Sequence, residues 1–184
     1  QNAWNGTDAS DQLFWLVGSD IIDGKAGNDT LNIPFSISQA GFSTTSSGLT
    51  YVHSIPDASG AISNIALFNI EKVSFIDGDY TIANPAKPNG VVLDWNSGPS
   101  YSALTAGDDQ FFWFGGSDFV DGLAGVDTVN IPLSITQAKF SRTSDGVNYV
   151  TVQGSSVALL NIEKVDFIDG TQNLTSSSFS SAVF

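Results

Sequence analysis

Cysteine, methionine and cationic residues are absent or scarce in this sequence. Its 184 residues include no cysteine, no methionine, one histidine and six lysines and arginines. The missing thiols exclude disulfide bonds, thiol nucleophiles and cysteine-ligated zinc, and a single histidine cannot build a histidine zinc site. The scarcity of cations excludes a basic surface for nucleic acid or for an anionic membrane. No apolar run reaches the ~20 residues that a membrane-spanning helix needs.

Glutamate is also rare, which gives the acidity of the chain a particular character. The formal net charge is −13, yet Glu71 and Glu163 are the only glutamates among 19 acidic residues. Aspartate favours turns and supplies a short, hard oxygen ligand, whereas glutamate favours helices. Because 41% of the residues are hydrophobic and 14% are charged, the chain can bury a core. The composition predicts acidic turns in an ordered β protein.

The chain is a tandem duplication. Residues 11–42 match residues 109–140 at 21 of 32 positions, and residues 69–78 recur as 161–170. The first match is offset by 98 residues and the second by 92. The difference places an insertion within 53–64 of the first copy, which we expect to be a surface turn. Two prolines and a glycine between the copies are typical of a linker. We therefore expect modules at 1–84 and 91–184, joined by a linker at 85–90.

Secondary-structure patterns outside the repeats are those of a β protein. Alternating apolar residues predict strands over 50–55, 147–152 and 165–168. Short helical turns are expected at 36–40 and 134–138, because each stretch follows a proline that can start a helix. Helix content should therefore be small.

A nine-residue repeat opens each module. Each copy has a glycine or alanine, an aspartate two residues later, and an apolar residue two residues after that. The six aspartates in this register are Asp11, Asp20, Asp29, Asp109, Asp118 and Asp127. Residues 24–32 and 122–130 match the nonapeptide of parallel β-helices that bind Ca²⁺, with Lys25 or Leu123 in place of one glycine.

The repeat chemistry predicts one calcium site in each module. Glycines allow tight turns that aim carbonyl oxygens at one point, and the aspartate adds a charged oxygen. Alternate nonapeptides lie on the same side of the coil, so the ion is expected between two stacked turns. The candidate carboxylate pairs are Asp11 with Asp29 and Asp109 with Asp127, and the candidate carbonyl donors are Gly24, Ala26, Gly122 and Ala124.

The middle repeat departs from this pattern. Its glycine positions hold Trp15-Leu16 in the first module and Trp113-Phe114 in the second, so bulky groups stand where the backbone should close on an ion. Asp20 and Asp118 are therefore candidate ligands without a paired turn. The alternative for all six aspartates is that they accept backbone N–H groups within their own turns.

The nonapeptides, together with the downstream segment Asn-Ile-Glu-Lys-Val-x-Phe-Ile-Asp-Gly, resemble the calcium-binding repeats of RTX (repeats-in-toxin, haemolysin-type) proteins. The resemblance implies a β-roll and export by type I secretion with an uncleaved C-terminal signal. Residues 176–184 are serine-rich and end in Ala-Val-Phe, which is similar to the short apolar endings of such substrates. The fold class we expect is all-β, with two modules that each open as a short parallel β-roll or β-helix and continue into further strands.

A few further residues have side chains that could serve sugar binding or catalysis. Trp15 and Trp113 recur in both modules, where they could stack on sugar rings or pack as buried rings. Glu71 and Asp77 could be imagined as a glycosidase pair, but the recurrence of the segment favours a structural role at a strand edge. His53 lacks a counterpart in the second module, and no Gly-x-Ser-x-Gly nucleophile motif accompanies it.

The function we expect is that of a secreted, non-enzymatic calcium-binding module that folds on meeting Ca²⁺ outside the cell and serves adhesion or surface or matrix association. A second hypothesis is a calcium-dependent, lectin-like carbohydrate-binding module that uses Trp15 and Trp113. A third is a polysaccharide-active enzyme with no site residue assigned. The expected partners are calcium and a glycan or a cell-surface molecule.

Overall fold

The structure is a computed structural model that describes residues 3–15, 18–54, 63–88, 92–93, 101–144 and 146–174. These residues form β-strands and two single-turn 3₁₀ helices, which confirms the all-β fold class. Contacts divide the chain into unit 1 (Gln1–Pro88) and unit 2 (Asn89–Phe184), with the boundary inside the expected linker. Across the described ranges, no helix is long and apolar enough to span a membrane.

Unit 1 begins as a parallel coil with two short strands in each turn. Ala3 pairs with Ile21 and Gln12 pairs with Thr30, so the pairing offset is 18 residues, twice the sequence repeat. Alternate nonapeptides therefore stack on one another, as the repeat predicts. The coil strands are β1 (Ala3–Asn5), β2 (Gln12–Phe14), β3 (Asp20–Asp23) and β4 (Thr30–Ile33).

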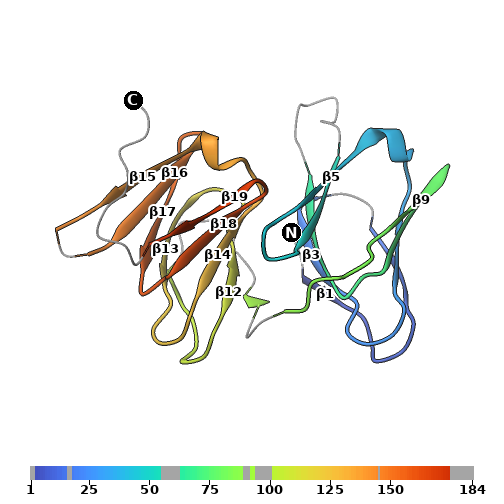
Figure 1. Cartoon of the computed structure of the whole chain (residues 1–184), viewed down its shortest axis with the longest axis horizontal. Helices are drawn as coiled ribbons and strands as arrows, with labels where there is room; N and C mark the ends of the chain where they lie inside the picture. The colour runs from blue at the N-terminus through green and yellow to red at the C-terminus, as the bar shows by residue number, and fades with distance from the viewer. Residues whose placement is uncertain are drawn as a thin grey trace. The chain divides into compact units, whose positions relative to one another are not determined.

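The rest of unit 1 extends the two sheets of the coil. β7 pairs in parallel with β3, and β8 pairs in parallel with β4, before antiparallel strands complete each sheet. The sheet orders are β1-β3-β7-β6-β5 and β2-β4-β8-β9. Figure 1 labels β1, β3 and β5 of the first sheet and β9 of the second. The added elements are the 3₁₀ helix η1 (Ile37–Gln39) and the strands β5 (Ala40–Thr44), β6 (Thr50–Ser54), β7 (Asn64–Phe68), β8 (Lys72–Phe75) and β9 (Gly78–Thr81).

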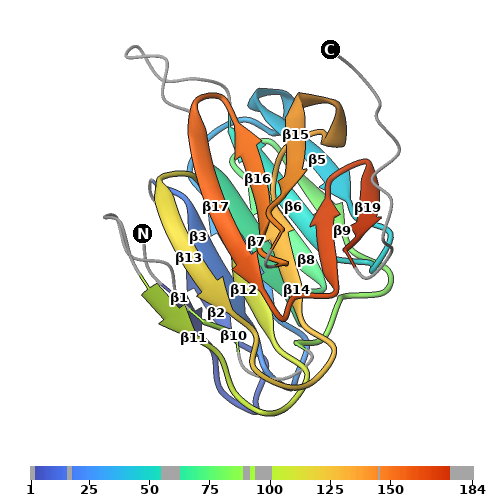
Figure 2. The same cartoon turned by 90° about the vertical axis from the view of Figure 1, so that its left-hand side faces the viewer.

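Unit 2 repeats this plan. Its sheets have the orders β10-β12-β14-β18-β19 and β11-β13-β17-β16-β15, and Figure 2 shows the neighbouring strands β13, β17 and β16 of the second sheet side by side. The elements are β10 (Val92–Leu93), β11 (Tyr101–Ala103), β12 (Gln110–Phe112), β13 (Ser117–Asp121), β14 (Thr128–Ile131), η2 (Ile135–Gln137), β15 (Ala138–Arg142), β16 (Asn148–Val152), β17 (Ser155–Leu160), β18 (Lys164–Phe167) and β19 (Gly170–Asn173).

The core of each unit lies between its two sheets. Successive side chains of a strand point to opposite faces, so the apolar residue of each nonapeptide points inward. In unit 1, Leu31 and Ile33 of β4 lie beside Val73 and Phe75 of β8, and all four are buried. Burial of each such side chain stabilises the fold by about 1.5–3 kcal/mol. The core fixes the coil, and the coil positions the turns at its ends.

The short helices η1 and η2 lie within the stretches 36–40 and 134–138, where helical turns are expected. Ser36 caps η1, and the Asp77 carboxylate accepts hydrogen bonds from the Ser36 hydroxyl and the Ile37 N–H. These two hydrogen bonds lower the pKa of Asp77 from its ordinary value. Asp169 makes the same bonds in unit 2. The turn between β8 and β9 is therefore bonded to the start of η1, and the turn between β18 and β19 is bonded to the start of η2.

Observed strands agree with those expected from alternation. The stretches 50–55, 147–152 and 165–168 correspond to β6, β16 and β18, whose bounds differ from them by no more than one residue at either end. Most of the insertion at 53–64 and all of the apolar ending at 176–184 lie outside the described residues.

Candidate metal centre

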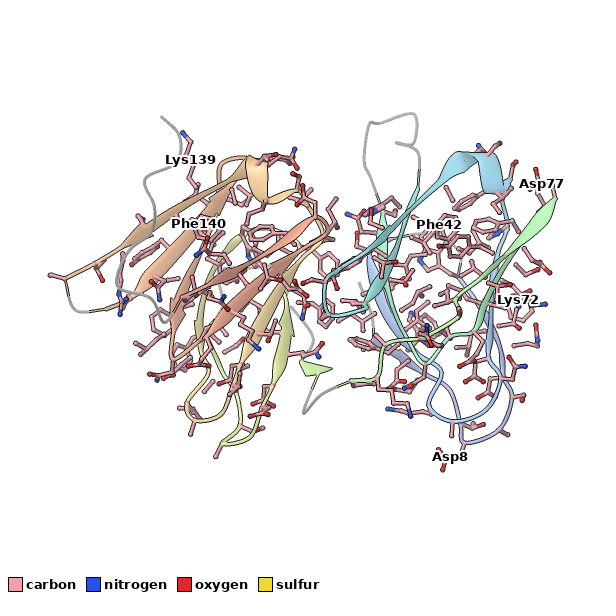
Figure 3. All side chains as sticks on the ribbon, viewed as in Figure 1. Asp8, Phe42, Lys72, Asp77, Lys139 and Phe140 are labelled. Carbon is pink, nitrogen blue, oxygen red and sulfur yellow. The ribbon has the colours of Figure 1, made fainter. Side chains whose placement is uncertain are left out.

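The nonapeptide turns of unit 1 stack at one end of the coil. Turn 6–11 joins β1 to β2 and turn 24–29 joins β3 to β4, and the pairing of these strands places the second turn directly on the first. Backbone hydrogen bonds join the coils at both ends of the turns, from Gly6 N–H to the Asp23 carbonyl and from Thr30 N–H to the Asp11 carbonyl. Figure 3 shows Asp8 at the tip of this end, with Asp77 at the opposite end.

A ladder of acidic side chains runs through the stack. The Asp11 N–H donates to Asp29 Oδ1 at 2.8 Å, and the Asp29 N–H donates to Glu71 Oε2 at 2.6 Å. The Asp11 carboxylate accepts from the Thr7 N–H at 2.6 Å. Asp29 and Glu71 therefore each hold the backbone of the coil before them, whereas Asp11 holds its own turn, and the charges of Asp11 and Glu71 act on Asp29.

Unit 2 has the same ladder with nearly the same distances. The Asp109 N–H donates to Asp127 Oδ1 at 2.9 Å, and the Asp127 N–H donates to Glu163 Oε2 at 2.8 Å. The Thr105 N–H donates to Asp109 Oδ2 at 2.7 Å. The structure thus brings together each aspartate pair that the repeat predicts.

The second aspartate of each pair is fully buried with one oxygen unsatisfied. Asp29 and Asp127 are 0% exposed, and their Oδ2 atoms have no hydrogen-bond partner among the described residues. Burial, with the neighbouring carboxylates of Asp109 and Glu163, raises the pKa of Asp127 to about 6. Burial likewise raises the pKa of Asp29, aided by Glu71 and Asp11. A buried carboxylate without a counter-charge is costly, so this geometry favours a bound cation.

Oxygen atoms converge on the glycines of these turns. A Cβ on Gly24 would lie 2.2 Å from the Asn69 carbonyl oxygen and 2.5 Å from Asp29 Oδ2, and a Cβ on Gly6 would lie 2.6 Å from the Gly24 carbonyl oxygen and 2.8 Å from Asp11 Oδ2. Glycine is required here because any side chain would collide with these oxygens. Gly24 and Gly122 are buried, whereas Ala26 and Ala124 are exposed.

The two units differ at the first of these positions. The residue equivalent to Gly6 is Leu104, which belongs to the hydrophobic core of unit 2. The second position is conserved between the units, because a Cβ on Gly122 would lie 2.0 Å from the Asn161 carbonyl oxygen and 2.5 Å from Asp127 Oδ2. Both units therefore have the same arrangement of a carbonyl oxygen and an aspartate oxygen beside Gly24 and Gly122.

The middle turns are built around tryptophan. Trp15 Nε1–H donates to Asp20 Oδ2 at 3.0 Å, and Trp113 Nε1–H donates to Asp118 Oδ2 at 2.9 Å. Both rings are buried, with exposed fractions of 4% and 1%. In this conformation a sugar cannot stack on either ring, and the two carboxylates are held by indole donors.

The remaining candidates have local partners. Glu71 precedes β8 and Asp77 follows it, so the strand separates the two carboxyl groups imagined as a glycosidase pair. The two ring nitrogens of His53 lie 2.6 Å from Asn64 Oδ1 and 3.0 Å from Ser43 Oγ. Lys25 Nζ pairs with Asp23 Oδ2 at 2.6 Å.

A cation in this centre would need backbone ligands. In the part of the chain that the structure describes, no three His, Cys, Asp or Glu side chains are grouped so that they could hold a metal. Calcium takes about 6–8 oxygen ligands and accepts carbonyls and water beside carboxylates. Tight turns with inward carbonyls provide such oxygens, so the donor set fits calcium and does not fit zinc.

Sequence reasoning did not assign Asn69 and Glu71 to this centre. They lie in a three-residue turn that has no glycine pattern, and Glu71 reaches Asp29 across 42 residues of sequence. The available signal was the recurrence of Asn-Ile-Glu in both modules, directly before a strand.

Comparisons with known proteins leave the family open. No family model and no curated protein matches the chain. Among solved structures, the chain is similar to the extracellular lipase LipA from Serratia marcescens, with 11% sequence identity and a TM-score of 0.30. The similarity covers 85% of this chain and 37% of the lipase chain, so this chain spans well under half of that protein.

Proposed function

We propose that this chain is a secreted calcium-binding protein whose stacked nonapeptide turns hold Ca²⁺. The observation that carries the proposal is the stack of acidic turns, which buries Asp29 and Asp127 completely and places the Gly24 carbonyl oxygen with Asp11 Oδ2 beside Gly6. The ion lies between the turn that ends in Asp11 and the turn that ends in Asp29, and between the equivalent turns of unit 2. The carbonyl of Gly24 in unit 1, and that of Gly122 in unit 2, joins the carboxylates as a ligand.

The chain's own residues set the dependence of folding on calcium. Without the ion, folding brings Asp11, Asp29 and Glu71 together and removes Asp29 from water, which opposes folding. Ca²⁺ at 100 times its dissociation constant would stabilise the folded state by about 2.7 kcal/mol per site. A cytoplasm low in calcium would therefore leave the chain less stable than the millimolar calcium outside the cell.

The extracellular part of the proposal is supported by the resemblance of the nonapeptides to RTX repeats. That resemblance connects calcium-dependent folding with export of an unfolded chain. Once folded, the protein would present its sheets for adhesion or for association with a surface or matrix, and no enzymatic role is assigned to it.

Thermal unfolding followed by circular dichroism tests the proposal. The protein is melted in ~5 mM CaCl₂ and in excess chelator. We expect a higher melting temperature in calcium, by roughly 10 °C or more if two sites each contribute about 2–3 kcal/mol. Equal melting curves in the two buffers would refute calcium binding at these turns.

Matched variants connect the effect to the turns. Changing Asp11, Asp29, Asp109 and Asp127 together to asparagine keeps side-chain size and should abolish the difference between calcium and chelator. Asp8→Asn is the control, since Asp8 is exposed at the tip of the same turn. The control should keep the full calcium effect, and loss of the effect in Asp8→Asn alone would contradict the ligand assignment.

A further inference from the structure

A third turn lies on each nonapeptide stack. Asn69, Ile70 and Glu71 join β7 to β8, and these strands pair in parallel with β3 and β4. Backbone hydrogen bonds connect the coils, from Gly24 N–H to the Phe68 carbonyl and from Glu71 N–H to the Asp29 carbonyl. We call this three-residue segment, and its equivalent 161–163 in unit 2, the closing turn.

The closing turn continues the acidic ladder with a different residue. Glu71 Oε2 accepts a hydrogen bond from the Asp29 N–H. In the same way, Asp29 Oδ1 accepts one from the Asp11 N–H. A turn of three residues is shorter than the six-residue nonapeptide turn, and the longer glutamate side chain reaches the same backbone position. Both glutamates of the chain occupy this place, since Glu163 Oε2 accepts from the Asp127 N–H.

The two oxygens of Asp29 have different environments. Oδ1 accepts the hydrogen bond from turn 6–11, while Oδ2 lies with the Asn69 carbonyl oxygen beside Gly24, within 2.5 Å of the position of a Cβ on that glycine. Asp29 is completely buried, and no described donor reaches Oδ2. A buried carboxylate oxygen that has no donor, and that lies beside a carbonyl oxygen, is costly unless a cation joins the two.

Unit 2 repeats this arrangement independently. Asp127 Oδ2 also lacks a donor among the residues described, and it lies with the Asn161 carbonyl oxygen beside Gly122. Asn69 and Asn161 both have positive φ angles, 49° and 51°, an uncommon conformation for a residue with a side chain. Nearby Lys25 is occupied by its ion pair with Asp23, and its equivalent in unit 2 is Leu123.

We propose that each unit holds a further Ca²⁺ between its second nonapeptide turn and its closing turn. The ligands from unit 1 are Asp29 Oδ2 and the Asn69 carbonyl oxygen, and those from unit 2 are Asp127 Oδ2 and the Asn161 carbonyl oxygen. Glu71 and Glu163 are positioning residues that hold the aspartate backbone and add negative charge. Further backbone oxygens and water complete the coordination. The inference rests on the proposed function, because it places an additional ion in the same stack.

Counting bound calcium in a double variant tests this closing site. The variant Asp11→Asn/Asp109→Asn removes the carboxylate of the first nonapeptide turn from each unit. Asp29, Asp127 and both closing turns stay unchanged. Bound Ca²⁺ is measured by equilibrium dialysis in ~2 mM CaCl₂ followed by atomic absorption, with folding checked by circular dichroism. We expect this variant to retain two ions per chain, one in each unit.

Removal of the closing-site ligands gives the complementary result. Adding Asp29→Asn and Asp127→Asn should reduce binding to zero, and asparagine can still accept the N–H of Asp11 or Asp109 through its own Oδ1. Gly24→Ala, which places a Cβ between the two ligands, should remove one ion from the otherwise unchanged protein. Glu71→Gln keeps an acceptor for the Asp29 N–H and should weaken binding of that ion without abolishing it, whereas Glu71→Ala should lose it.

The outcomes separate the two proposals. If the unchanged protein binds calcium but the folded Asp11→Asn/Asp109→Asn variant binds none, the closing site is refuted and the proposed function stands. If the unchanged protein binds no calcium, the proposed function itself fails. Retention of all ions in the folded Gly24→Ala variant would also overturn the closing site.

Discussion

At the residue scale, the buried aspartates link the turn geometry to an electrostatic cost. Asp127 is fully buried among other acids, and its pKa is raised to about 6 by burial and by the charges of Asp109 and Glu163. In an unfolded chain the same carboxyl would titrate near 3.8. Protonation is therefore easier in the folded state, which determines the sign of the pH dependence without calcium.

Calcium-free protein should lose stability as the pH rises from about 4 to above 6. Between these values the folded state binds more protons than the unfolded state, and a stability contribution on the order of 1–3 kcal/mol from Asp127 is lost as its folded-state proton dissociates. The check is a series of melting curves in chelator from pH 4 to 7. Asp127→Asn should flatten the pH dependence of stability. If stability instead rises from pH 4 to 7 in the unchanged protein but not in the variant, the assignment of this dependence to Asp127 is contradicted.

Leu123 is another residue whose conformation carries a cost. It stands where the nonapeptide has glycine, its φ angle is 65°, and its side chain is 48% exposed. A positive φ costs a non-glycine residue on the order of 1–3 kcal/mol, while glycine adds flexibility to the unfolded chain. Leu123→Gly should therefore raise the free energy of unfolding by ~0.5–1 kcal/mol in urea denaturation. Lys25→Gly is the comparison in unit 1, where loss of the ion pair with Asp23 should reduce the gain.

At the scale of the element, the turns of the nine-residue repeat have two different internal structures. Turns 6–11 and 24–29 stack and place carboxylates together, whereas the middle turn holds its aspartate with an indole. The tryptophan N–H takes the place that a cation would have at Asp20. One sequence repeat therefore produces a stacked acidic turn at one end of the coil and, at the other end, a turn held by a tryptophan–aspartate hydrogen bond.

Trp113→Phe should destabilise the protein without changing its calcium content. The variant removes the 2.9 Å hydrogen bond from Nε1 to Asp118 Oδ2 and part of a fully packed side chain. A lost hydrogen bond to a buried charged group costs about 1.5–3 kcal/mol. Urea unfolding measures the loss, and equilibrium dialysis measures bound calcium. A fall in bound calcium would assign Asp118 to an ion site instead.

The sequence was informative where structure follows a local repeat. The nine-residue register predicts the 18-residue pairing offset, the inward apolar residues, and the approach of Asp11 to Asp29. It does not predict Glu71 as the next acid of the ladder, because the closing turn has no glycine motif and the contact spans 42 residues. The repeat also does not predict the hydrogen bond from Trp15 to Asp20, although the two residues lie close in sequence.

At the scale of the whole molecule, the net charge is −13, and the turn stacks hold the acidic ladders of both units. Salt screens exposed charges but reaches buried groups such as Asp29 only weakly. We therefore expect 0.5 M NaCl to raise the melting temperature of the calcium-free protein by less than 5 mM CaCl₂ does. Mg²⁺ at 5 mM should also fall short of Ca²⁺, since it demands a smaller octahedral site. An equal effect of Mg²⁺ and Ca²⁺ would indicate general charge screening.

The central claim, that these turns hold calcium, is tested most directly by anomalous X-ray diffraction from crystals grown in calcium. The account predicts anomalous difference peaks in the turn stacks, with Asp29 Oδ2 in unit 1 and Asp127 Oδ2 in unit 2 at about 2.3–2.6 Å from an ion. Well-ordered turns without a peak in either stack, in crystals that contain several millimolar Ca²⁺, would contradict it.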